Sequence, residues 1–74
     1  MESYDIDERL RGLEHSYEVT TRSLTSCRHE FELLSRTPEE SPARLAQLAL
    51  KIERLGRERR RISEQIGALE DLVA

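Results

Sequence analysis

The chain has 74 residues, of which 36% are charged and 4% aromatic, with a net charge of -3 and a mean hydropathy of -0.68. These values describe one small domain with a marginal core, and they give no reason to expect a nucleic-acid or membrane partner. No apolar run approaches the ~20 residues that span a bilayer. The acidic start at residues 1–5 is no signal peptide, and a lone Cys27 excludes an internal disulfide. We therefore expect a cytoplasmic protein.

The first half of the chain predicts one long helix over about residues 5–36. Mostly apolar residues recur there at alternating steps of four and three, which is the heptad pattern of a coiled coil with apolar a and d positions. We call these positions the seam of the helix, and Thr20 is the clearly polar residue among them. The seam residues are Ile6, Leu10, Leu13, Tyr17, Thr20, Leu24, Cys27, Phe31 and Leu34.

The stretch SRTPEESPARL, residues 35–45, contains two helix-start signals. Residues 37–40 have the form of a capping box with Pro38 at the first helical position. Pro42 opposes a helix that runs on from there, because it lacks an N–H and disfavours helical geometry at Ser41. We therefore predict a turn over about 37–41 and a second helix that starts with Ser41 as its cap.

The second half predicts a helix over about residues 42–73 with the same seam spacing. Arg59 is its one charged seam member. The seam residues are Leu45, Leu48, Ile52, Leu55, Arg59, Ile62, Ile66, Leu69 and Val73.

The two seams match when the chain folds back on itself. Setting Leu34 opposite Leu45 places Thr20 opposite Arg59, so the polar position of one helix meets the charged position of the other. A slip of one heptad would set the arginine against apolar groups, which is costly, so this layer is predicted to fix the register. The predicted fold is all-α, an antiparallel two-helix hairpin. The predicted hairpin core is Leu10, Leu13, Tyr17, Leu24, Cys27, Phe31, Leu48, Ile52, Leu55, Ile62, Ile66 and Leu69.

The hairpin makes one further prediction, about charges outside the seam. Glu30 and Lys51 should lie opposite each other on one flank of the two helices. The alternative to the hairpin is an extended parallel coiled coil of two chains with a kink in the middle. In that structure Cys27 of one chain would lie next to Cys27 of the other.

A hairpin with one seam is thin, and apolar residues remain outside it. Small residues also recur at position e of the second helix, where they would let another helix approach closely. Such positions can equally be tolerated surface positions. The predicted partner face consists of Val19, Leu33, Ala49, Leu50, Gly56 and Ser63, with Leu72 also outside the seam.

The sequence gives little sign of chemistry. Cys27 should be buried as a small hydrophobe, and His15 and His29 are outer-face positions about 21 Å apart, too far for a shared metal. We expect no enzyme, no cofactor, no metal and no small-molecule substrate. A candidate basic strip on the second helix consists of Arg54, Arg57, Arg60 and Arg61. Interleaved glutamates favour a solvated face with ion pairs, then an acidic protein partner, then nucleic acid.

The pattern as a whole predicts a non-enzymatic helical interaction module, an adaptor or co-chaperone that binds another helical protein or a second copy. The alternative is a nucleic-acid-binding regulator that uses the arginine-rich second helix. In size, hairpin layout and amphipathicity the chain resembles the small two-helix co-chaperones of type III secretion needle subunits. That resemblance implies a larger helical chaperone as the partner.

Overall fold

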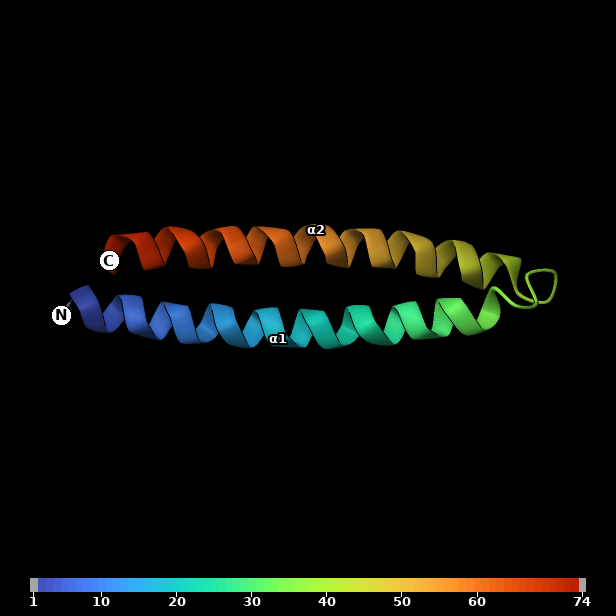
Figure 1. The fold of residues 1–74 in the computed structure, drawn as a ribbon, viewed down its shortest axis with the longest axis horizontal. Coiled ribbons are helices and arrows are strands. Elements are labelled where there is room, and N and C mark those ends of the chain that lie inside the picture. Colours follow the sequence, from blue (N-terminus) through green and yellow to red (C-terminus); the bar gives the residue numbers. More distant parts are fainter. Residues whose placement is uncertain (1, 74) are drawn as a thin grey trace.

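The chain folds into two long helices packed side by side in opposite directions (Figure 1). The computed structural model describes residues 2–73, with side chains from residue 5 onward. Helix α1 spans Glu2–Leu34 and helix α2 spans Pro42–Val73, and the molecule measures 57 × 15 × 14 Å. This arrangement confirms the predicted antiparallel hairpin and excludes the extended parallel coiled coil with a mid-chain kink.

The reversal takes place over residues 35–41. Hydrogen bonds from Thr37 N–H to the Leu34 carbonyl (3.1 Å) and from Glu40 N–H to the Thr37 carbonyl (3.1 Å) form consecutive turns. The carbonyl of Ser41 then accepts the N–H of Leu45 at 3.0 Å, which is the first bond of α2. Pro42 is the first residue of that helix, where its missing N–H has no intrahelical partner to lose. Helix α1 begins at Glu2 and ends at Leu34, so it is shifted toward the N-terminus relative to the expected 5–36.

The core lies along the line where the two helices meet. Leu24 and Leu48 are 0% and 1% exposed, and Cys27, Ile62 and Thr20 are also buried. The other seam residues of both helices are half-buried, apart from Tyr17 and Val73. Because two helices can cover only one stripe of each other, most of the apolar seam keeps some contact with water.

Tyr17 departs from its predicted place in the core, since it is 37% exposed. It is an a-position residue beside the polar layer, and its ring reaches the edge of the seam rather than the middle. A phenol is suited to this place, because its ring can pack on apolar atoms while its hydroxyl stays in water.

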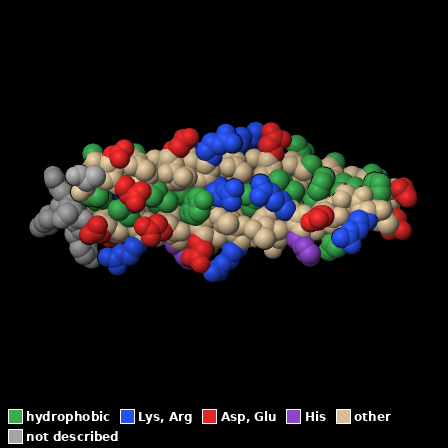
Figure 2. Space-filling model, in the orientation of Figure 1, with side chains coloured by type: hydrophobic (Ala, Val, Ile, Leu, Met, Phe, Trp, Pro, Cys, Tyr) green, Lys and Arg blue, Asp and Glu red, His purple; other side chains and the backbone are tan. Residues whose placement is uncertain are grey.

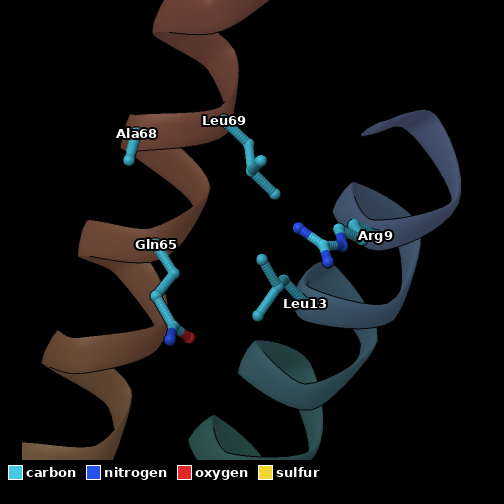
Figure 3. A pocket seen from close by; sticks show the side chains of 5 residues that line it. All are labelled: Arg9, Leu13, Gln65, Ala68 and Leu69. Carbon is cyan, nitrogen blue, oxygen red and sulfur yellow. The ribbon is translucent and has the colours of Figure 1, made fainter. Parts of the chain in front are cut away.

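Side chains of the two helices face each other across the seam. Figure 3 shows Leu13 of α1 and Leu69 of α2 pointing toward each other, with Gln65 beside them. In the middle of the hairpin Thr20 is buried and Arg59 is half-buried. Among the residues with described side chains, no hydrogen bond joins these two, so their role in fixing the register stays a prediction.

The core makes a direct prediction about two leucines of α2 that are two residues apart. Leu48→Ala should lower the free energy of unfolding by about 2–5 kcal/mol, since it leaves a cavity in the best-packed layer. Leu50→Ala is the matched control, because that side chain is 68% exposed and its loss should change stability by less than about 0.5 kcal/mol. Urea unfolding followed by circular dichroism measures both. Equal losses in the two variants would contradict this assignment of the core.

Candidate interaction surfaces

One side of the hairpin, which we call the g flank, is where the g positions of both helices meet. Its residues near the turn are Ser23, Glu30, Arg44 and Lys51. Here the Arg44 guanidinium donates two hydrogen bonds to the Glu30 carboxylate, at 2.8 and 3.0 Å. Lys51 lies on the same flank as Glu30, as expected from the sequence, but the hydrogen-bonded partner is Arg44. Its forked guanidinium binds both carboxylate oxygens at once, which an ammonium cannot match.

This ion pair favours the charged forms of both side chains, and it therefore shifts the pKa values of both. The hydrogen bond from Arg44 lowers the pKa of the Glu30 carboxyl below 4.5, and the charge of Lys51 adds to the effect. The same bond raises the pKa of Arg44. Both side chains remain close to half exposed, so water screens the pair and its contribution to stability is modest.

The opposite side, which we call the e flank, contains a groove rich in arginine. We name it the arginine groove. It is lined by Tyr17, Arg28, Ile52, Glu53, Gly56, Arg57, Arg59, Arg60 and Ser63. Tyr17 and Arg28 come from α1 and the others from α2, so the groove exists only because the hairpin brings the two helices together.

The arginine groove is strongly positive within an acidic chain. Its four arginines and one glutamate leave a formal charge of +3, whereas the whole chain carries -3. Arg57 donates to Glu53 at 3.2 Å, so the one acid of the groove already has a partner. No ion pair involves Arg28, Arg59 or Arg60 among the described side chains. On the face shown in Figure 2, Lys and Arg side chains gather over the middle of the molecule.

The predicted partner face does not lie on one side of the molecule. Gly56 and Ser63 line the arginine groove on the e flank. Val19 and Leu33 stand in the same heptad column of α1 as Ser26, which lies on the g flank with Glu30. Leu50 is on the outer side of α2 and is 68% exposed. Ala49 is exposed and occupies position e of α2, like Gly56 and Ser63. Exposed apolar side chains are therefore distributed around the hairpin.

The predicted basic strip is divided as well. Arg57 and Arg60 belong to the arginine groove, while Arg54, Arg57, Glu58 and Arg61 surround a separate shallow hollow on α2. Sequence reasoning missed Arg28, which joins the groove from α1. The signal for it was present: Arg28 occupies an e position, and antiparallel helices bring e positions to the same flank.

A third hollow lies toward the end with the termini (Figure 3). Leu13, Ala68 and Leu69 form its apolar part, and Arg9 and Gln65 border it. The seam residues there are only half-buried, which leaves apolar surface within reach of a neighbouring helix.

No protein-family model, curated protein or solved structure matches the chain. Within the described residues, no helix is long and apolar enough to cross a membrane. No group of three His, Cys, Asp or Glu side chains in that same part could hold a metal ion. Cys27 is buried and unpaired with another cysteine.

The Glu30 assignment can be tested by titration. Because its pKa is lowered in the folded state, the ion pair stabilises the fold above the ordinary carboxyl range and is lost as the pH falls through the folded pKa. Arg44→Gln should raise the pKa of Glu30 more than Lys51→Gln does, since the hydrogen bond from Arg44 is the largest cause. Carboxyl-detected NMR titration measures the difference. A larger effect from Lys51→Gln would contradict the assignment of Arg44 as the principal partner of Glu30.

The three glycines test whether the space beside each of them is open in the isolated hairpin. Apart from the neighbouring backbone of its own helix, a Cβ built on Gly12, Gly56 or Gly67 would meet no atom within 4 Å, and all three lie inside helices. Replacement by alanine should therefore stabilise the hairpin by about 0.5–1 kcal/mol at each position, through helix propensity alone. Thermal unfolding of the three single variants measures this. A loss of stability in Gly56→Ala alone would show that the isolated hairpin itself needs that glycine.

Proposed function

We propose that the chain is a non-enzymatic helical interaction module that completes a helical bundle with another helical protein or with a second copy. The observation that carries the proposal is the distribution of apolar side chains. Leu24, Cys27, Leu48 and Ile62 are the buried apolar residues of the described part, while Tyr17, Val19, Leu33, Leu50, Leu72 and Val73 are exposed. Further helices laid on the hairpin would cover this surface.

The physical argument rests on the balance between burial and order. Fully burying a large apolar side chain stabilises a fold by about 1.5–3 kcal/mol, while ordering each residue costs about 1–2 kcal/mol of backbone entropy. A hairpin with so few fully buried side chains gains little over that cost. Small scaffolds commonly meet the shortfall by oligomerisation, and this chain has no disulfide to replace it.

The specific form of this function that we propose is that of an adaptor or co-chaperone. Its support is the hairpin layout, the small size and the amphipathic helices, which are the features shared with the type III secretion needle co-chaperones. A pull-down from the source cell that recovers no chaperone or secretion component would remove this specific form and leave the general module in place.

A nucleic-acid-binding regulator is the second candidate, and the formal charge of +3 in the arginine groove supports it. It requires salt-dependent binding to DNA or RNA that is lost when Arg57, Arg60 and Arg61 are neutralised. No binding at low salt would end it.

The molecular mass in solution and the stability of the chain test the proposal that the hairpin needs further helices. We expect either a mass above the 8.6 kDa of one chain, with an unfolding temperature that rises with concentration, or a monomer that is only marginally stable alone. Sedimentation equilibrium and thermal unfolding over a range of concentrations distinguish these results. A monomer with the ordinary domain stability of about 5 kcal/mol or more would contradict the proposal, because such a hairpin needs no further helices.

A further inference from the structure

We propose that the arginine groove is the docking site for an acidic amphipathic helix of a partner protein. This inference rests on the proposed function and names the chemistry of the partner. The partner helix presents a stripe of small and apolar side chains with Asp or Glu residues on both sides of that stripe.

The charges of the groove set the sign of the partner. Arg28 stands on the α1 rim and Arg60 on the α2 rim, both exposed, with no ion pair among the described side chains. Arg59 lies between the helices and is half-buried. Unpaired guanidinium groups on both rims favour a ligand whose carboxylates flank its line of contact on both sides.

The floor of the groove sets the shape of the partner. Gly56 and Ser63 are seven residues apart on α2, hence about 10 Å along the helix, and a Cβ on Gly56 would meet nothing within 4 Å. Ile52 and Tyr17 add apolar surface that is partly open to water. A floor of small residues, with Ile52 and Tyr17 beside them and charged rims on both sides, fits a helix lying along the groove, because backbones can approach closely there.

The same features favour a protein helix over nucleic acid. Phosphate binding draws on many basic contacts along a backbone and makes no use of the partly open apolar surface of Ile52 and Tyr17. From residue 52 to residue 63 the groove extends about 17 Å, close to three helical turns, which is the scale of a helix-in-groove contact.

A designed peptide tests the inference on the intact chain. The probe repeats the heptad Leu-Glu-Ala-Ala-Glu-Lys-Glu four times, which places Leu and Ala in one stripe with Glu on both sides. The control peptide exchanges every Glu for Lys and every Lys for Glu. Fluorescence anisotropy should show binding of the acidic peptide that weakens as salt increases, and no binding of the basic one.

Matched arginine variants locate the site. Arg28→Gln combined with Arg60→Gln should weaken binding of the acidic peptide by about tenfold or more, equivalent to about 1.4 kcal/mol. Arg54→Gln combined with Arg61→Gln removes the same charge outside the groove and should change the affinity less than about twofold. Gly56→Leu should block binding, whereas Gly12→Leu on α1 should not. Circular dichroism and unfolding temperature verify that each variant is folded.

Several results would overturn the inference. They are no binding of the acidic peptide at low salt, equal losses in the two arginine pairs, and tighter binding to a DNA duplex of about twenty base pairs than to the peptide. A chain that forms a stable oligomer through this groove and excludes the peptide would identify a second copy as the occupant. Such an oligomer would refute the acidic partner while leaving the helical interaction module intact, so the two proposals fail separately.

Discussion

The hairpin depends on the match between two heptad seams that run in opposite directions. Each seam alone is a stripe of apolar side chains that no single helix can bury. When the chain turns back at residues 35–41, Leu24 and Leu48 become almost fully buried. Both lie in the half of the hairpin nearer the turn. Toward the termini, Leu10, Leu13 and Leu69 are only half-buried, and so are Phe31, Leu34 and Leu45 next to the turn, so the best-buried part of the core lies between the two ends.

The same geometry sorts the charges. Antiparallel helices bring g positions together on one side and e positions on the other. On the g flank this unites opposite charges, and Glu30 and Arg44 bind each other at 2.8 Å. On the e flank it unites like charges, since Arg28 joins the arginines of α2. An ion pair thus joins the two helices on the g flank, whereas Arg28, Arg59 and Arg60 of the arginine groove have none among the described side chains. The side that lacks its countercharge is the one with an open floor at Gly56.

Much of the architecture was predictable because it depends on periodicity and on backbone chemistry. The seam spacing indicated two helices, and the rigid ring of Pro42 placed the start of the second one where α2 begins. The sequence could not decide which of several nearby side chains would become the contact partner of a given residue. Glu30 had both Arg44 and Lys51 within one heptad, and the fork of the guanidinium decided between them. Tyr17 occupied a core position in the heptad, yet its ring reaches the rim. The apolar residues outside the seam also could not be assigned to one face by composition alone, and the structure distributes them around both helices.

The position of Gly56 brings these arguments together. Glycine in a helix interior costs about 1 kcal/mol relative to alanine, and nothing in the hairpin occupies the space where its Cβ would be. Internal packing therefore supplies no reason for glycine here, and the same holds at Gly12 and Gly67. What distinguishes Gly56 is its surroundings: it lies between the arginine rims, in line with Ser63 and next to the half-buried Ile52. A local loss of helix stability inside the arginine groove is understandable if that space is filled by the backbone of another helix. The exposed apolar residues of the hairpin and the open groove at Gly56 then have the same meaning, because both leave surface that a partner can cover.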